Sequence, residues 1–440
     1  MEPERDVPQM SEPQIPETPS SETRPGEPRA ARSSARRPTV LALQVGNRPG
    51  PRICRSLGEA GFKVVATHEP GRFRGHSRYH PAPIRTPSPE LSPDLFLESV
   101  EAICRKHGVD AVVPGDDERA LRLLATRLPS PGGAVLVGPT TEQFNLVCDK
   151  GNLHDTARAA GLDTPRAAYV GLADTGEPEW PPLPSVVKPR FAPAEGRGVP
   201  LRRSAWSVST PAERDSAVAL VHAAEVDALV EERIVGRAWR IHFVTDGRQT
   251  FAIPVVTIRS FPPDAGESSV QIVPATSPAE LYSATDRLIA HLGYKGPGSF
   301  QFFERDGRFY LHDVNLRLPS SVGLSIAAGL DMPRLGVEVA LGLEPTLSGP
   351  VHYGVRYVAL EHELKSLAWR IRKHESPARV WEVASDIVLA AVLPSRVLDQ
   401  FSVTDPLPTV ALGAQLSREV LRWRAEEGGR RGAAKAHAAG

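Results

Sequence analysis

The chain has 440 residues, a length that predicts two or three domains. Its 52 lysines and arginines balance 52 aspartates and glutamates, so net charge does not favour nucleic acid or a membrane surface as a partner. The longest apolar run, Ile387 to Leu393, is far shorter than the roughly 18 residues that span a bilayer, and the first residues lack the apolar core of a secretory signal, so we expect a cytoplasmic protein.

Both ends of the chain have a composition typical of disorder. Residues 1–38 are rich in Pro, Glu, Ser and Arg, and their only sizeable apolar side chains are Val7, Met10 and Ile15. Such a segment cannot bury enough surface to offset the entropy of ordering. Residues 426–440 have the same character, so we expect a disordered tail at each end.

Residues 39–138 alternate between short apolar runs and stretches with helical periodicity. In chain order we expect strand 39–45, helix 52–60, strand 62–66, helix 95–106, strand 111–114, helix 117–126 and strand 134–137. This alternation predicts an α/β domain with a parallel, Rossmann-like sheet covered on both faces. The turn 46–50 lacks the G-x-G-x-x-G fingerprint, so a structural domain is favoured over a dinucleotide site.

After residue 138 the pattern changes to strands of antiparallel character. Alternating β-branched and aromatic residues predict strands at 185–188, 228–232, 239–244, 250–256 and 299–303. We therefore expect an α+β domain over residues 139–348. Residues 349–425 read as a smaller C-terminal region of mixed strand and helix.

The strongest functional signal is the segment Gly296–Arg317, in which Asp306-Gly307 separates two apolar-aromatic runs and predicts a hairpin. On the second strand, the two-residue period puts Asp313, Asn315 and Arg317 on one face. The carboxylate and amide oxygens suit Mg²⁺ bound to a polyphosphate, and the guanidinium suits a phosphoryl group. A solvent-facing strand edge with ordinary polar residues is the alternative interpretation.

The turn type decides whether Gln301 and Asp313 can share one ion. A simple two-residue turn would put Gln301 across from His312, which faces away from Asp313. A type I turn followed by Gly307 as a G1 bulge would shift the register by one and bring Gln301 across from Asp313. We therefore expect the second turn, with positive φ at Gly307.

Lysine usage indicates a phosphate site. Eight lysines among the 52 lysines and arginines leave 44 arginines, so the chain uses Arg for generic positive charge. Lys188 ends an apolar strand, where a compact ammonium suits a phosphate. Lys150 opens a helix and fits either a phosphate or an ordinary solvated position. The loop 194–199 holds Gly196 and Gly198, whose backbone amides could fold over phosphates.

Together these residues resemble the ATP-grasp superfamily, nearest its carboxylate–amine ligase (ATP-dependent carboligase) branch, over residues 39 to about 420. The resemblance implies a mobile lid at about 185–230. It assigns ATP to Lys150, Lys188, Gly196, Gly198, Glu231, Glu232 and Ile234, with the adenine at Glu231 to Ile234. It assigns Mg²⁺, with Mn²⁺ as a second candidate, to Gln301, Asp313 and Asn315. It assigns the transferring phosphoryl or the substrate carboxylate to Arg317 and Arg259.

The chain departs from this family's pattern at two places. The family usually carries Glu at both metal positions, where this chain has Gln301 and Asp313, and the shorter Asp must draw the metal closer to the strand. The hinge also lacks the Glu that commonly follows its glycine, since Gly236 is followed by Arg237, Ala238 and Trp239. The residue that contacts the ribose therefore stays open.

The resemblance implies a ligase that activates a carboxylate as an acyl phosphate and joins it to an amine. The expected partners are these small molecules, with no nucleic acid and no membrane, and a homodimer stays open. Two alternatives remain, namely a catalytically weakened ATP-binding regulatory or scaffold protein, and an ATP-dependent kinase. The histidines are scattered, which argues against a transition-metal site. The chain lacks a Gly-x-Ser-x-Gly elbow, which argues against a serine hydrolase. Its three cysteines are widely spaced, which argues against a disulfide framework.

Overall fold

The computed structural model describes residues 36–70, 77–80, 82–129, 133–174, 176, 178–190, 205–263, 267–399, 401–410 and 413. The predicted glycine loop with Gly196 and Gly198, residues 1–35 and the tail 426–440 lie outside these residues. One compact unit begins at Arg37, and it contains three sheets. None of the described helices is both long and apolar enough to cross a membrane.

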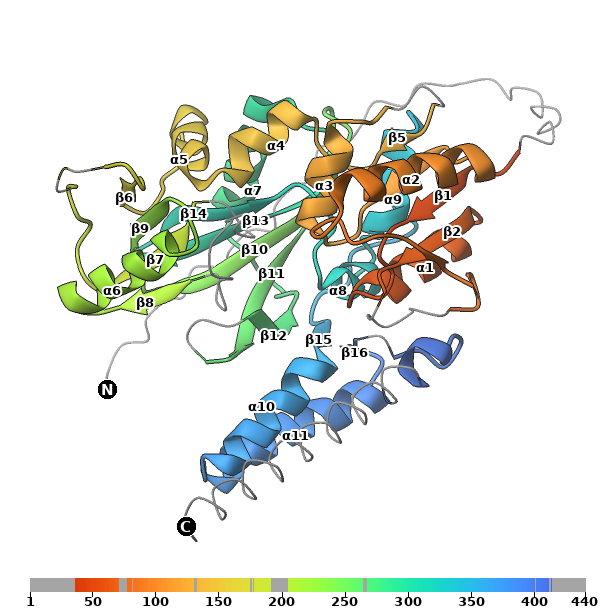
Figure 1. Cartoon of the computed structure of the whole chain (residues 1–440). Coiled ribbons are helices and arrows are strands. Elements are labelled where there is room, and N and C mark those ends of the chain that lie inside the picture. Colours follow the sequence, from red (N-terminus) through yellow and green to blue (C-terminus); the bar gives the residue numbers. More distant parts are fainter. Residues whose placement is uncertain are drawn as a thin grey trace, which may run out of the picture. The chain divides into compact units, whose positions relative to one another are not determined.

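The first sheet is parallel and has five strands in the order β3-β2-β1-β4-β5 (Figure 1). Its strands are β1 (Thr39–Ala42), β2 (Lys63–His68), β3 (Ile84–Arg85), β4 (Ala111–Val113) and β5 (Val135–Leu136), and its helices are α1 (Gly50–Glu59), α2 (Pro93–His107) and α3 (Glu118–Ala125). Leu41 and Val112 face α2 and α3, whereas Val40 and Val113 face α1. The predicted parallel α/β domain is confirmed.

The second sheet has seven strands in the order β14-β13-β10-β11-β12-β15-β16. They are β10 (Arg237–Thr245), β11 (Thr250–Phe261), β12 (Glu267–Ile272), β13 (Gly296–Arg305), β14 (Arg308–Asn315), β15 (Arg356–Val358) and β16 (Arg396–Leu398). Because β15 pairs with β12, the C-terminal region extends this sheet.

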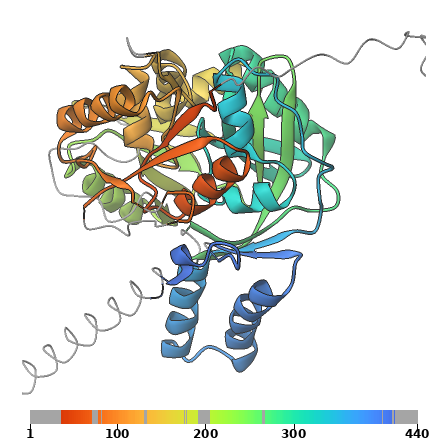
Figure 2. The same ribbon diagram turned by 90° about the vertical axis from the view of Figure 1, so that its right-hand side faces the viewer.

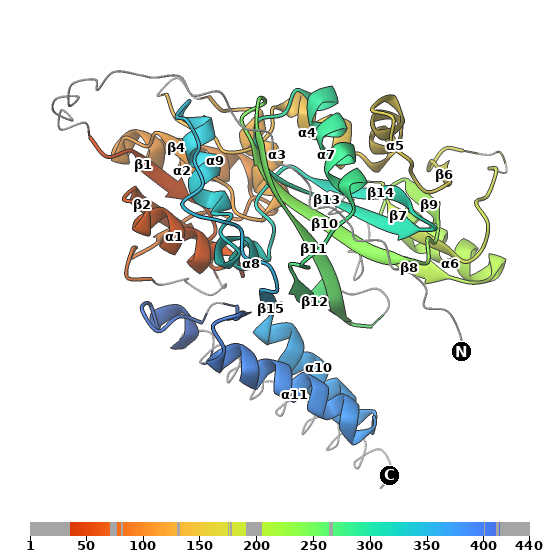
Figure 3. The same ribbon diagram turned by 180° about the vertical axis from the view of Figure 1, so that it is seen from behind.

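Helices α4 (Thr141–Cys148), α5 (Lys150–Ala159) and α7 (Ala279–Leu292) pack against part of the second sheet (Figure 3). Trp239, Ile241 and Phe243 of β10 belong to the core that these helices cover. Since side chains alternate along a strand, Arg240 and His242 point to the opposite face. That opposite face carries the candidate site.

The third sheet has four strands in the order β6-β9-β7-β8. It comprises β6 (Ala167–Val170), β7 (Ser185–Pro189), β8 (Trp206–Val208) and β9 (Ala228–Glu232), and its apolar core includes residues of α6 (Pro211–His222). These elements include the segment 185–230, which we expected to form the lid. Strand β6 belongs to the same sheet but lies before this range in the sequence.

Two further helices, α10 (Leu360–Arg372) and α11 (Pro377–Val392), lie side by side next to β15 and β16 (Figure 2). Arg259 of β11 is buried and reaches both helices. It forms ion pairs with Glu363 of α10 at 2.5 Å and with Asp386 of α11 at 2.7 Å. Asp386 also pairs with Arg356 and Arg396, so a network of charges ties both helices to the second sheet.

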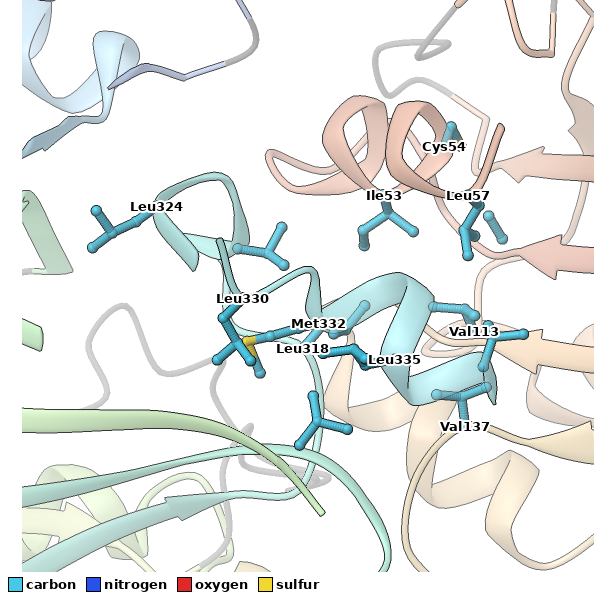
Figure 4. Close-up of a cluster of buried hydrophobic side chains, with 14 of the residues drawn as sticks. Ile53, Cys54, Leu57, Val113, Val137, Leu318, Leu324, Leu330, Met332 and Leu335 are labelled. Atoms are coloured by element: carbon cyan, nitrogen blue, oxygen red, sulfur yellow. The ribbon is translucent and has the colours of Figure 1, made fainter. Parts of the chain in front are cut away.

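One apolar core joins the first sheet to the segment after β14 (Figure 4). Ile53 and Leu57 of α1 and Val113 of β4 lie around Leu335 of α9 (Met332–Ala340), and Leu330, which lies before this helix, belongs to the same core. Leu324 of α8 (Val322–Ala327) belongs to the same core. The first sheet is therefore packed firmly against the chain that follows Arg317.

Candidate nucleotide and metal site

A row of polar side chains crosses three neighbouring strands of the second sheet. Gln301 of β13 lies directly across from Asp313 of β14 on one side and from Arg240 of β10 on the other. Residues that face each other across antiparallel strands have their side chains on the same face. The three side chains therefore share the face that the helices leave uncovered.

The turn of the hairpin between β13 and β14 differs in type from our prediction. Arg305 pairs with Arg308, and both turn residues have positive φ, 53° at Asp306 and 74° at Gly307, as in a type I′ turn. The predicted type I turn with a G1 bulge is wrong, because the type I′ turn already matches the twist of the two strands. The positive φ at Gly307 is confirmed.

A bulge further along the hairpin corrects the register. Phe302 pairs with Leu311 and Gln301 pairs with Asp313, so His312 is the extra residue. The imidazole of His312 stacks on Phe303, with the ring centroids 4.2 Å apart. Burial, helped by the charge of Lys188, lowers the pKa of His312 to about 3, so this ring is neutral at physiological pH. The prediction that Gln301 faces Asp313 is confirmed.

Asp313 is the centre of the candidate metal site. Gln301 Nε2 donates a hydrogen bond to Asp313 Oδ2 at 2.5 Å, and Asn315 Nδ2 donates to the same oxygen at 2.7 Å. The amide nitrogens converge on this carboxylate, and the oxygens of the carboxylate and of the two amide groups are hard donors. Mg²⁺ is usually held by one or two protein carboxylates together with phosphates and water, so this set fits Mg²⁺.

Both predicted lysines line the first cavity together with Asp313. Lys150 Nζ is 3.9 Å from Asp313 Oδ1. Burial lowers the pKa of Lys150, but the carboxylates of Asp313, Glu118 and Glu231 outweigh it and raise the pKa above its usual value. Lys150 is therefore charged and available to a phosphate.

Lys188 is held by a buried carboxylate. Its Nζ is 2.5 Å from Glu231 Oε2, and Glu231 Oε1 is 3.0 Å from His154 Nε2. Burial raises the pKa of Glu231, but Lys188 and His154 more than compensate and hold the pKa well below its usual range. The Glu231 carboxylate thus positions Lys188, and the contact of adenine with the segment Glu231 to Ile234 stays a prediction.

Two cavities meet at this site. The first has a volume of about 470 Å³ and is lined by Lys150, Gln301, Asp313, Asn315 and Arg317 among others. The second has a volume of about 450 Å³ and is lined by the hinge segment Glu231 to Gly236 and by apolar groups that include Val186 and Phe303. Lys188, Arg240 and Gln301 line both cavities, so they mark the junction.

The remaining predicted residues are placed as follows. Arg317 lines the first cavity, and Ile234 lines the second. Glu232 also lines the second cavity, but its carboxylate is paired with Arg305 at 2.8 Å and Arg166 at 3.2 Å. Arg259 lines neither cavity, because the carboxylates of α10 and α11 bind its guanidinium. The predicted role of Arg259 at the phosphoryl group is therefore corrected to a structural one.

Arg240 is a site residue that we did not predict. It lines both cavities, and it forms no ion pair or hydrogen bond with the described part of the chain. Burial lowers its pKa, but an arginine stays protonated at physiological pH. The alternation of side chains along the predicted strand 239–244 is enough to predict that Arg240 lies on the face opposite to the apolar side chains. The pairing of β10 with β13, which puts it beside Gln301, is not visible in the sequence.

Comparison with known proteins agrees with this fold. Residues 226–363 match a family model described as ATP-grasp in the biosynthetic pathway with Ter operon. Two similar solved structures are biotin carboxylase from Campylobacter jejuni and L-amino acid ligase from Bacillus licheniformis, each with a TM-score of 0.56. Their sequences are 17% and 19% identical, and the matches cover 72% and 73% of this chain and 74% and 79% of theirs.

Curated relatives include the carbamoyl phosphate synthase large chains of Thermoplasma acidophilum and Methanosarcina acetivorans. They are 25% and 24% identical over 376 and 384 residues, which is 80% and 82% of this chain. The chain spans about a third of their length, because the matches cover 32% of each. The protein therefore has the ATP-grasp fold that the resemblance implied, and residues 226–363 match an ATP-grasp family model.

Proposed function

We propose that the protein is a ligase that uses Mg-ATP to activate a carboxylate as an acyl phosphate and then joins the acyl group to an amine. The observation that carries this proposal is the row of Asp313, Gln301 and Arg240, which lines one cavity together with Lys150 and Lys188 where a second cavity meets it. Polar groups of both charges meet there beside a partly apolar cavity, as a nucleotide with its phosphates requires.

In this proposal each cavity has a separate task. The hinge segment and Phe303 would enclose the adenine, while Lys188, Lys150 and Arg240 would neutralise the phosphates. Gln301, Asp313 and Asn315 would hold Mg²⁺, with Mn²⁺ as a second candidate. The ion would withdraw charge from the phosphate oxygens.

The acid would bind in the first cavity, with its carboxylate near Arg317. A carboxylate oxygen would attack the γ-phosphorus, so that an O–P bond forms while the bond from that phosphorus to the ADP oxygen breaks. Catalysis would come from position and charge, as in other phosphoryl transfers. The third sheet would act as the lid that keeps water from the acyl phosphate.

The test is ADP release from Mg-ATP in the presence of candidate acids and amines, given singly and together. Release that requires an acid and an amine supports a ligase. A stable phosphorylated product without an amine would show a kinase, and nucleotide binding without turnover would show a regulatory protein.

Asp313→Asn should abolish magnesium-dependent turnover, because it removes the only carboxylate of the donor set, whereas Asp313→Glu should retain turnover. Asp155→Asn on the exposed surface of α5 is the matched control. Full activity of Asp313→Asn would contradict the metal assignment.

We further propose that the protein works in the cytoplasm. The structure leaves Cys54, Cys104 and Cys148 as free thiols, and all three are buried. Unpaired cysteines are typical of a reducing compartment.

A further inference from the structure

The first cavity is lined in part by the carboxyl ends of β1 and β4. The chain leaves β1 toward β2 on one side, while β4 lies on the other side, so the two strand ends form a topological switch point. In open α/β sheets ligands bind in the crevice at such a point. Arg48 follows β1, and Asp116 and Glu118 follow β4, and all three line the cavity.

Two of the carboxylates at this crevice form no ion pair with a described residue. Arg48 is occupied by Glu267 at 3.4 Å and Asp399 at 3.7 Å. Asp116 accepts a hydrogen bond from Asn47 Nδ2 at 3.1 Å, but it forms no ion pair with a described residue.

Glu118 is the second carboxylate without a direct ion pair. It accepts a hydrogen bond from the Cys148 thiol and, like Asp116, forms no ion pair within the described part of the chain. Burial raises the pKa of Glu118 above its usual range, although Arg317 and Lys150 act in the opposite direction. Two carboxylates therefore line the cavity without a direct ion pair to a described residue, and of these Glu118 also lies within the electrostatic influence of Arg317 and Lys150.

A buried amide in the same cavity also lacks a partner. Gln271 of β12 is 1% exposed and lines the first cavity. Neither its Nε2 nor its Oε1 has a hydrogen-bond partner among the described residues. A buried amide is normally hydrogen-bonded, so a ligand in the cavity would complete it.

We propose that Asp116, Glu118 and Gln271 form the subsite for the amine substrate, which enters as an ammonium or alkylammonium ion. The inference rests on the proposed ligase function and assigns a place and a charge state to its second substrate. The carboxylates compensate the positive charge, and the Gln271 amide binds a polar group of the same molecule.

Glu118 then takes one proton from the ammonium group, which leaves a neutral amine and a protonated carboxyl. The lone pair of the amine attacks the carbonyl carbon of the acyl phosphate, so that the C–N bond forms. The bond from that carbon to the phosphate oxygen breaks, and its electron pair leaves with the phosphate. The second proton lost by the nitrogen goes to the departing phosphate.

A binding experiment tests the subsite without any substrate. Crystals of the full chain with Mg-ADP are soaked in rubidium chloride, because rubidium is close to ammonium in size and scatters anomalously. We expect an anomalous peak between Asp116 and Glu118 in the wild type and in Glu142→Gln, an exposed control on α4. The peak should be lost in Asp116→Asn and Glu118→Gln. A wild type without this peak would overturn the proposal, as would an unchanged peak in both variants.

A kinetic experiment tests the proton transfer. Bicarbonate, acetate and N-acetyl amino acids serve as the acids, with either ammonium chloride or hydroxylamine as the nucleophile at pH 7. These nucleophiles are similar in size, but ammonia is largely protonated at this pH and hydroxylamine is largely neutral. Glu118→Gln should lower ammonium-dependent product formation by about 100-fold, while hydroxamate formation stays within about two-fold.

The outcomes separate this inference from the proposed function. A wild-type protein that forms no hydroxamate with any acid argues against an acyl phosphate, and the rubidium peak then decides the subsite alone. Equal loss of both activities in Glu118→Gln would overturn the role of Glu118, as would full retention of both.

Discussion

At the scale of single residues, the Lys188–Glu231–His154 chain determines where the positive charge of the site lies. A buried ion pair adds little net stability, because the cost of removing both charges from water offsets their attraction. Its contribution is to fix position. Glu231 holds the Lys188 ammonium at the junction of the two cavities, where Arg240 and Gln301 also lie.

Lys188→Ala should weaken the binding of Mg-ATP. The loss of a charge-assisted contact costs roughly 1.5–3 kcal/mol, which corresponds to a rise in Kd of about 10-fold to 150-fold. Isothermal titration calorimetry measures this change. Lys106→Ala on the exposed face of α2 is the control, and an unaltered Kd in Lys188→Ala would remove Lys188 from the site.

Glu231→Gln should lower the free energy of unfolding by about 3 kcal/mol at neutral pH, because it leaves Lys188 without its partner. The folded pKa of Glu231 is depressed, so the ionised carboxylate stabilises the fold above its unfolded pKa of about 4.3. That stability is lost as the pH falls toward the folded pKa. Urea unfolding at pH 7 and pH 3 should therefore show a smaller difference between variant and wild type at pH 3.

At the scale of elements, the hairpin of β13 and β14 depends on two local devices. The type I′ turn at Asp306-Gly307 closes it, and the bulge at His312 moves the register by one residue. Without the bulge, Asp313 would face away from Gln301 and Arg240. The metal row therefore depends on one extra residue in one strand.

Gly307→Ala should lower the free energy of unfolding by about 1 kcal/mol, because φ at this position is +74° and a side chain strains a left-handed backbone. Gly349→Ala is a matched control, since Gly349 has open space for a Cβ and no positive φ. Chemical denaturation measures both variants. Equal stability of the two would contradict the turn assignment.

The hairpin also shows how far the sequence could be interpreted. The Asp-Gly pair identified the turn, and the need for a shared face correctly predicted that Gln301 lies across from Asp313. The place of the bulge could not be predicted, because His312 has no sequence feature that separates it from a regular strand residue. Its cause is tertiary, namely the stacking on Phe303 and the packing around it.

At the scale of the whole molecule, Arg259 connects the second sheet to α10 and α11. The resemblance to the ATP-grasp superfamily had assigned Arg259 to the transferring phosphoryl or the substrate carboxylate. Its three carboxylate partners, Glu363, Glu382 and Asp386, lie more than 100 residues further along the chain. A prediction from local sequence could not include them.

Arg259→Ala should lower the free energy of unfolding by about 3 kcal/mol, because buried carboxylates lose their partner. The Kd for Mg-ATP should stay within about two-fold, since Arg259 lines neither cavity at the nucleotide site. Arg287→Ala, which breaks an exposed ion pair with Glu280, is the control. A large rise in the Kd for Mg-ATP in the folded Arg259→Ala protein would restore the original assignment.

The core that joins β1 to α9 has a consequence for synthesis of the chain. Ala42 and Leu335 share this core, yet 293 positions (335 − 42) separate them in the sequence. At roughly 5–20 residues per second, a ribosome needs about 15–60 s to make the intervening chain. During that time the apolar face of the first sheet has none of its cover from α9. The two halves of this core are therefore united only late in synthesis of the chain, and until then the apolar side chains that α9 covers stay accessible.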